Sequence, residues 1–277
     1  MTTISEALRK CRAALEAAGS GEARAEARLM ACAATGLDEA GLIIHDQDEI
    51  PEETLLRMAD ACQRRCKGEP LAYILGFRDF FGLRLHVTPA VLIPRQDTEI
   101  LVEQALSASF STACDLGTGS GAVILALKSQ RPDARCWACD ISEDALEVAR
   151  GNAEDLGLEV AFVRSSWLSA PDLSALRFDL IVSNPPYIEE GDPHLERTSL
   201  PYEPLKALTS GPDGLDDIRV IAAQAPARLE KGGRLLLEHG YDQGGKVRAI
   251  LRDAGFDDVR TARDLEGRER VSMGIKG

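Results

Sequence analysis

The first part of the chain carries apolar residues at helical spacing. Ile4, Leu8, Cys11 and Leu15 lie three or four residues apart, which places their side chains on one face of an α-helix. A Thr-x-x-Glu capping box begins just before them at Thr3. Two more helices are predicted over residues 22–34 and 51–68. Residues 1–68 are therefore predicted to form a small helical bundle, and they contain no catalytic cluster.

The pattern changes between residues 69 and 94. Short apolar runs are separated by Gly76, Gly82 and Pro89. Short strands joined by tight turns have this pattern, so we expect strands that form a β-hairpin linker, beginning near residue 71. An amphipathic helix is predicted after Pro94, with Asp97 or Thr98 as its N-cap.

From residue 112 onward, runs of strand length alternate with stretches of helical periodicity. This alternation is typical of a parallel sheet with helices on its faces. The predicted strands cover residues 113–116, 134–139, 160–163, 180–182, 234–237, 258–261 and 270–274, and the predicted helices cover 122–129, 143–156, 215–229 and 247–254. The larger part of the chain is thus predicted to be an α/β domain with seven strands.

Charge and hydropathy limit the partners and the compartment. The formal net charge of −13 disfavours sequence-independent binding of nucleic acid, which depends on Lys and Arg side chains that neutralise phosphates. No apolar run approaches the length of a membrane span, and residues 1–20 have no apolar signal core. We therefore expect a cytoplasmic protein that binds neither a membrane nor nucleic acid.

The seven cysteines do not form a metal-binding pattern. Cys136 and Cys139 have the spacing of a redox or zinc-binding pair, but no second pair matches them. They also fall within a predicted strand, where residues three apart point to opposite faces. We interpret them as reduced core thiols and expect no metal.

A glycine-rich turn follows the strand at 113–116. Gly117 and Gly119 allow a sharp backbone turn close to a ligand, and the next helix offers free N–H groups. The pattern is neither the dinucleotide fingerprint nor a P-loop, so a compact ligand with a carboxylate is expected. Asp140 ends the next strand, where an acid accepts hydrogen bonds from ribose hydroxyls in related folds. Asp115 either meets an ammonium group or braces the turn.

A second candidate site follows the strand at 180–182. Asn184, Pro185, Pro186 and Tyr187 come shortly after it. Each proline restricts the residue before it, so Asn184 is held extended at the edge of the sheet where ligands bind in open α/β folds. Its side-chain oxygen and the Pro185 carbonyl are two acceptors suited to a planar NH2 group.

Together the two sites indicate methyl transfer. A ligand with a carboxylate, an ammonium, a ribose and a reactive cation is S-adenosylmethionine, which yields S-adenosylhomocysteine. An amide nitrogen is a poor nucleophile because its lone pair is delocalised. Acceptors at Asn184 and Pro185 would orient that lone pair and favour the charge that builds on nitrogen.

The same residues resemble a known family, the HemK/PrmC protein-(glutamine-N5) methyltransferases that act on class 1 peptide-chain release factors. The resemblance covers nearly the whole chain and includes residues 69–76, 92–99, 115–121, 140–142, 184–187 and 237–244. It implies an N-terminal helical substrate-recognition domain (1–68), a β-hairpin linker (69–94) and a class I, Rossmann-like S-adenosylmethionine-dependent domain (95–277). The implied substrate is the glutamine of a Gly-Gly-Gln motif in the release factor. We expect the enzyme to be a monomer.

Carried over position by position, the resemblance implies two sets of site residues. The donor would contact Gly117, Thr118, Gly119, Ser120, Gly121, Asp140, Trp167 and Asn184. The glutamine would be held by Asn184, Pro185, Pro186 and Tyr187, with Asn184, Pro185 and Tyr187 as the catalytic residues. Trp167 would pack on the adenine, the alternative being a core tryptophan. Arg95 and Thr98 would lie near the donor, and Ser166 stands where the family commonly has an acid.

Other functions use similar motifs. A sibling family methylates a glutamine of a ribosomal protein, and only a substrate assay separates the two. DNA adenine-N6 methyltransferases share the Asn-Pro-Pro-Tyr motif, but the net charge and the lack of a DNA-reading segment disfavour DNA. A non-enzymatic assembly factor is disfavoured because both motifs are intact.

Overall fold

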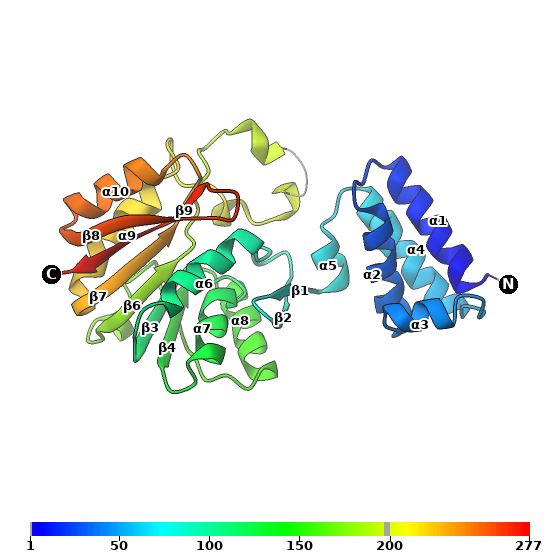
Figure 1. Cartoon of the computed structure of the whole chain (residues 1–277), viewed down its shortest axis with the longest axis horizontal. Helices are drawn as coiled ribbons and strands as arrows, with labels where there is room; N and C mark the ends of the chain where they lie inside the picture. Colours follow the sequence, from blue (N-terminus) through cyan, green and yellow to red (C-terminus); the bar gives the residue numbers. More distant parts are fainter. Residues whose placement is uncertain (1, 197–199) are drawn as a thin grey trace. The chain divides into compact units, whose positions relative to one another are not determined.

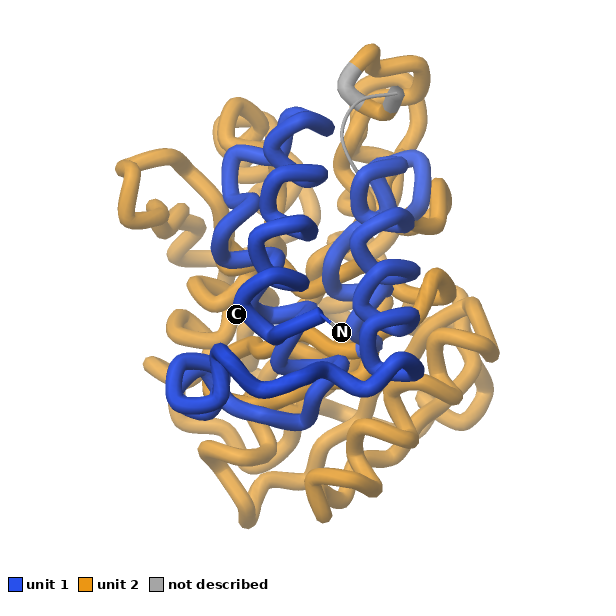
Figure 2. The backbone as a smooth tube through the Cα atoms, turned by 90° about the vertical axis from the view of Figure 1, so that its right-hand side faces the viewer, with its two compact units in different colours: residues 1–76, 198–202 blue, residues 77–197, 203–277 orange. Residues whose placement is uncertain are grey.

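The computed structural model describes residues 2–196 and 200–277. Two compact units make up the chain, and Figure 2 colours them separately: residues 1–76 with 198–202, and residues 77–197 with 203–277. The predicted helical bundle lies within the first unit, and the predicted α/β domain lies within the second.

The first unit is helical, as predicted. Its helices are α1 (Ile4–Ala17), α2 (Ala23–Thr35), α3 (Glu39–Ile44), α4 (Glu52–Cys66) and α5 (Leu71–Leu75) (Figure 1). The capping box at Thr3 is confirmed, because its hydroxyl accepts from the Glu6 N–H while the Glu6 carboxylate accepts from the Thr3 N–H. Leu15, Met30 and Met58 are buried together in the core of this unit.

Helix α5 contradicts the prediction of strands from residue 71. Pro70 precedes its first turn, and Gly76 ends it in the left-handed region with a φ of 80°. Proline at a helix start and glycine at its end are helix boundaries as well as turn signals, so the same residues were compatible with both structures. Leu71 and Leu75, which share one face of this helix, pack against the core of the first unit.

The predicted hairpin is confirmed in the second unit. Strands β1 (Phe77–Phe80) and β2 (Leu83–His86) pair antiparallel. Asn152 ties them to the α/β core: its Oδ1 accepts from the His86 N–H at 2.6 Å, and its Nδ2 donates to the carbonyls of His86 and Ser120 at 3.0 and 2.9 Å. Because Ser120 belongs to the glycine-rich turn, one buried asparagine joins the hairpin and the turn.

The seven-stranded sheet has the order β5-β4-β3-β6-β7-β9-β8. Its strands are β3 (Thr112–Leu116), β4 (Arg135–Asp140), β5 (Ala161–Arg164), β6 (Phe178–Ser183), β7 (Leu229–Glu238), β8 (Phe256–Arg263) and β9 (Glu269–Lys276). The neighbours from β5 through β7 pair parallel, whereas β9 pairs antiparallel with both β7 and β8. Because β3, β4, β5 and β6 are parallel, their carboxyl ends lie along one edge of the sheet. The strand order changes direction between β3 and β6, and ligands bind at such a point in open α/β sheets.

Two helical layers cover the sheet. One layer contains α6 (Glu99–Leu106), α7 (Ala122–Gln130) and α8 (Glu143–Asp155), and the other contains α9 (Asp216–Gln224) and α10 (Gly244–Asp253). Along β6, Leu180 and Val182 face the first layer while Ile181 faces the second, as strand geometry requires. Among the residues that the structure describes, no helix has the length and apolar character needed to cross a bilayer.

The strand prediction for the two central cysteines is confirmed. Cys136 packs in the core on one face of the sheet and Cys139 in the core on the other. All seven cysteines are free thiols. Burial raises the pKa of Cys136 to about 11, so this thiol stays protonated and unreactive at neutral pH.

Candidate active site

A cavity of about 440 Å³ lies at the carboxyl ends of the parallel strands. Each of the strands β3, β4, β5 and β6 contributes the residues that follow it or end it. The lining residues used below are Gly117, Gly119, Asp140, Ser166, Trp167 and Asn184, together with the loop segments 90–92 and 204–207. The cavity thus brings together both motifs that the sequence singled out.

The glycine turn is held against the end of β4. The N–H groups of Gly117 and Thr118 donate to the Cys139 carbonyl at 2.8 and 3.0 Å. Gly117 and Gly119 have φ angles of 69° and 55°, in the left-handed region that favours glycine. Both glycines expose their backbone to the cavity, as predicted.

The other predicted residues of the turn do not line the cavity. Thr118 and Ser120 are buried, and Gly121 turns the chain with a φ of 83° into the first turn of α7. The Thr118 hydroxyl donates to the Asp115 carboxylate at 2.7 Å. Burial raises the pKa of Asp115 to about 7. Asp115 therefore stabilises the glycine-rich turn through its hydrogen bond with Thr118. Of the two alternatives for this residue, binding an ammonium group or holding the turn, this is the second.

Asp140 presents a fixed carboxylate to the cavity. The Gly119 N–H donates to Oδ2 at 3.0 Å and the Ser142 N–H donates to Oδ1 at 2.9 Å. Each carboxylate oxygen has a second lone pair. The side chain can therefore accept two further hydrogen bonds from a ligand, as a ribose diol would supply.

Trp167 lines the cavity in a constrained conformation. Its φ of 53° is positive, which is uncommon for a bulky residue. The ring packs over Gly117, where an added Cβ would lie 3.2 Å from Cζ3. The indole Nε1–H donates to Asp217 at 3.2 Å. A backbone strain maintained beside a cavity is typical of functional sites, so the interpretation as a plain core tryptophan is the weaker one.

Asn184 reaches the cavity from the end of β6. Its Nδ2 donates to the Thr98 hydroxyl at 3.1 Å, which leaves Oδ1 as the acceptor of the side chain. Thr98 precedes α6 without forming a side-chain cap, and the Asp97 carboxylate pairs with Arg270 at 2.9 Å. Thr98 thus occupies the predicted N-cap position of α6, but neither it nor Asp97 forms a side-chain cap, because tertiary partners take both side chains.

Of the three residues after Asn184, Pro186 lines the cavity, whereas Pro185 and Tyr187 do not. Burial, together with the negative charge of Glu238, raises the pKa of Tyr187. The Tyr187 carbonyl accepts from Gln243 Nε2 at 2.9 Å. This hydrogen bond holds the backbone of the loop.

Sequence reasoning missed several residues that shape the cavity. Asp217 both lines it and holds Trp167. The buried Glu203 carboxylate pairs with Arg95 and accepts from the Ile93 N–H at 3.2 Å, so it joins the segments on either side of the cavity mouth. Neither acid lies in a recognisable local pattern.

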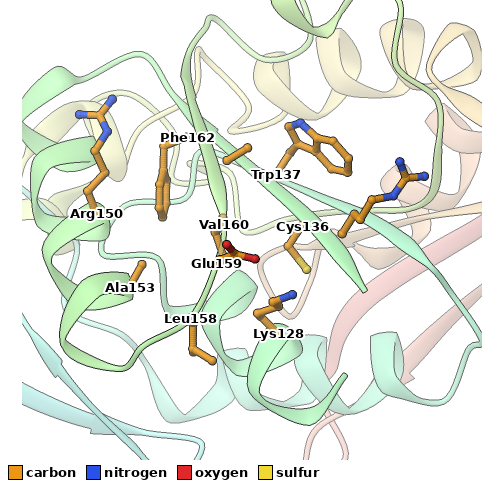
Figure 3. Close-up of a pocket in the computed structure, with 11 residues that line it drawn as sticks. Lys128, Cys136, Trp137, Arg150, Ala153, Leu158, Glu159, Val160 and Phe162 are labelled. Atoms are coloured by element: carbon orange, nitrogen blue, oxygen red, sulfur yellow. The ribbon is translucent and has the colours of Figure 1, made fainter. Parts of the chain in front are cut away.

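A second, larger hollow of about 610 Å³ lies beside β4 and β5 and away from both motifs (Figure 3). Two of its three cationic side chains already have polar partners, and the third, Arg135, lies over the Trp137 ring at 5.9 Å from the centroid. Lys128 donates to the carbonyls of Pro132 and Ala134, and Arg150 pairs with Glu143. Size alone therefore does not make this hollow the functional site.

Two family models match separate parts of the chain. Residues 6–76 match the PrmC N-terminal domain, and residues 95–199 match the methyltransferase small domain.

Curated relatives match most of the chain. A protein of Neisseria gonorrhoeae named release factor glutamine methyltransferase is 48% identical over 251 residues, which cover 90% of this chain and 92% of that protein. A protein of Salmonella typhimurium with the same name is 44% identical over 255 residues and covers 91% of each chain.

Solved structures share the fold at low identity. A methyltransferase from Pyrococcus furiosus superposes with a TM-score of 0.56 at 19% identity, covering 79% of this chain and 99% of that one. The 16S rRNA N2 G1207 methyltransferase of T. thermophilus, in complex with AdoMet and guanosine, superposes with a TM-score of 0.53 at 21% identity and covers 73% of this chain and 50% of that one. These likenesses support the Rossmann-like methyltransferase fold.

Proposed function

The chain belongs to the family of release factor glutamine methyltransferases, and on that premise we propose its reaction. It transfers the methyl group of S-adenosylmethionine to the side-chain nitrogen, N5, of the glutamine in the Gly-Gly-Gln motif of a class 1 release factor. The observation that carries this proposal is the position of Asn184, which lines the same cavity as Gly117, Gly119 and Asp140. An amide acceptor thus lies beside the surface suited to a nucleoside.

The cavity residues fit a nucleoside with a charged tail. Asp140 has free lone pairs for ribose hydroxyls, and Trp167 offers a ring face for adenine. Gly117 and Gly119 keep the turn open to the ligand, since a side chain at Gly117 would meet the Trp167 ring. Ser166 also lines the cavity and supplies a hydroxyl where the family commonly has an acid. Bound S-adenosylmethionine would supply an electrophilic methyl group.

Asn184 and Pro185 carry the chemistry on the substrate side. Asn184 Oδ1 accepts one N–H of the glutamine amide, and the Pro185 carbonyl, which lies outside the wall of the donor cavity, accepts the other from the substrate side. These hydrogen bonds turn the nitrogen lone pair toward the methyl donor and stabilise the positive charge that develops on nitrogen. No general base is needed before transfer, because the product nitrogen can lose its proton afterwards.

A release factor is favoured over the alternative substrates. The matched curated relatives bear the name release factor glutamine methyltransferase, and a net charge of −13 opposes binding to DNA.

Mass spectrometry of the substrate tests the reaction. We expect wild-type protein and S-adenosylmethionine to produce a methylated Gly-Gly-Gln peptide in an intact release factor. A release factor with the glutamine replaced by alanine is the matched control and should remain unmodified. Donor-dependent labelling of a ribosomal protein or of DNA, with none on the release factor, would contradict the proposal.

We further propose that the first unit recognises the release factor. Helix α3 of this unit exposes two neighbouring isoleucines, Ile43 at 69% and Ile44 at 75%. Adjacent exposed apolar side chains are typical of interaction surfaces rather than of a solvated helix.

A double substitution tests this assignment. We expect Ile43→Ser with Ile44→Ser to slow methylation of intact release factor about three- to tenfold, because the lost apolar contacts weaken docking. Methylation of a short Gly-Gly-Gln peptide should stay at the wild-type rate. Leu265→Ser is the matched control, since this leucine is fully exposed in the second unit. Equal slowing with both substrates would exclude a docking role.

A further inference from the structure

Among the described residues, two acids line the cavity, and the proposed function gives a role to only one of them. Asp140 is suited to the ribose hydroxyls, whereas Asp217, in the first turn of α9, lines the same cavity with no ligand group assigned to it. The Asp217 backbone N–H donates to the Ser210 hydroxyl at 2.8 Å, which fixes the start of the helix. The Asp217 side chain is half-buried, so it can reach both the protein and a ligand.

One oxygen of the Asp217 carboxylate is used and the other is free. Oδ1 accepts the Trp167 Nε1–H at 3.2 Å, and an indole N–H is a donor only. Oδ2 has no hydrogen-bond partner within the part of the chain that the structure describes. Because the indole N–H lies in the plane of its ring, the carboxylate stands at the edge of the Trp167 ring. Oδ2 is thus beside any planar group that stacks on the face of that ring.

The Trp167 ring is held at both of its ends. Its benzene end packs over Gly117, and its pyrrole end is bound by Asp217. Helix α9 also holds the next residue, because the Leu168 N–H donates to Gln224 Oε1 at 3.0 Å. The ring is therefore already fixed in the free protein. A base can stack on it without a further cost in ordering the side chain.

We infer that Asp217 selects the base of the methyl donor. This inference rests on the proposed function, in which adenine stacks on Trp167, and it adds that the 6-amino group of the adenine donates an N–H to Asp217 Oδ2. A 6-oxo purine presents an acceptor at the same position, and two acceptors oppose each other. One carboxylate thus has two roles: Oδ1 positions the aromatic ring, and Oδ2 recognises the base.

Exchanging the carboxylate for an amide tests the base contact. Calorimetry compares S-adenosylhomocysteine with its 6-oxo analogue, S-inosylhomocysteine. Wild-type protein is expected to bind the adenosyl compound about 10- to 100-fold more tightly, the value of a hydrogen bond to a charged acceptor. In Asp217→Asn, the indole N–H can bind only the amide oxygen, which turns Nδ2 toward the base. An amide N–H suits a 6-oxo group, so the preference should be lost or reversed. An unchanged preference would overturn the inference.

Asp216→Asn is the matched control. This neighbouring acid pairs with Arg219 at 2.8 Å and lies outside the cavity wall, so both compounds should bind to this variant as they bind to the wild type. An equal loss of preference in Asp216→Asn and Asp217→Asn would show a general effect of charge and overturn the inference.

Adenosine separates the base of the donor from its amino-acid tail. Asp217→Asn should weaken the binding of adenosine by the same factor as that of S-adenosylhomocysteine, because both ligands carry the 6-amino group. A loss confined to S-adenosylhomocysteine would assign Asp217 to the ammonium group of the tail and contradict base recognition.

The positioning role of Oδ1 is measured in the free protein. In ¹⁵N-labelled protein, the Trp167 indole proton, assigned by its absence in Trp167→Phe, should keep the downfield position of a hydrogen-bonded proton in Asp217→Asn and lose it in Asp217→Ala. The Asp217→Ala variant should also bind S-adenosylhomocysteine no better than Asp217→Asn does. An indole signal in Asp217→Ala identical to that of the wild type would overturn the positioning role.

Binding of these ligands requires no methyl transfer, so the two proposals can fail separately. A protein that shows the base preference, and loses it in Asp217→Asn, but leaves the release factor unmethylated would contradict the proposed function alone. Normal methylation by the wild type, with equal affinity for the adenosyl and inosyl compounds, would contradict the role of Asp217 alone.

Discussion

Replacing Asn184 with alanine is expected to lower kcat for release factor methylation on the order of 100- to 1,000-fold, the loss found when one stabilising polar group is removed from a transition state. The physical reason is that the remaining Pro185 carbonyl can orient only one of the two amide protons. Conjugation then keeps the nitrogen lone pair delocalised and away from the donor.

The measurement is single-turnover methylation followed by mass spectrometry, with donor affinity measured by calorimetry on the same preparation. Donor affinity should change far less than kcat, because Gly117, Gly119, Asp140 and Trp167 remain in place. A variant that methylates the Gly-Gly-Gln peptide at the wild-type rate would remove Asn184 from the mechanism.

Replacing Gly117 with alanine is expected to weaken donor binding about 10- to 100-fold. The substitution has two costs: alanine is disfavoured at a φ of 69° by about 1–2 kcal/mol, and its Cβ would lie 3.2 Å from the Trp167 ring. Either the ring moves or the turn does, and both changes alter the wall of the cavity.

Gly157→Ala is the matched control for this prediction. Gly157 has a φ of 64° and an added Cβ there would meet nothing within 4 Å, so it shares the backbone cost without the contact. It should bind the donor as the wild type does. Titration of the tryptophan fluorescence provides the readout, since both tryptophans, Trp137 and Trp167, lie in the second unit. Equal weakening in both variants would assign the effect to backbone strain alone.

The strands of the sheet were predicted within a few residues because their signal is local. Apolar runs such as Leu180–Ile181–Val182 can be buried in few other ways than as a covered strand. Helix α5 was missed because proline and glycine, here Pro70 and Gly76, mark both turns and the ends of helices. The choice between the two depended on the packing of Leu71 and Leu75 against the core of the first unit, which is not a local property.

The predicted site residues also fall into two groups, those that line the cavity and those that do not. Gly117, Gly119, Asp140, Trp167, Pro186 and Asn184 line the cavity as the motifs indicated. Thr118, Ser120, Gly121, Pro185 and Tyr187 were predicted beside them but are absent from the cavity wall. Neighbouring residues in a turn face either the cavity or the protein core. A sequence motif therefore locates the turn but does not show which of its side chains face the cavity.

The sequence by itself determined the local backbone: a sharp glycine turn after β3, and a stiff extended segment from Asn184 created by two prolines. These features are steric and need only neighbouring residues. The tertiary structure alone decided the partners, namely Thr98 for Asn184 and Asp217 for Trp167. Such contacts join side chains on different elements, and their distances are set by how the helices pack on the sheet, which no local pattern encodes.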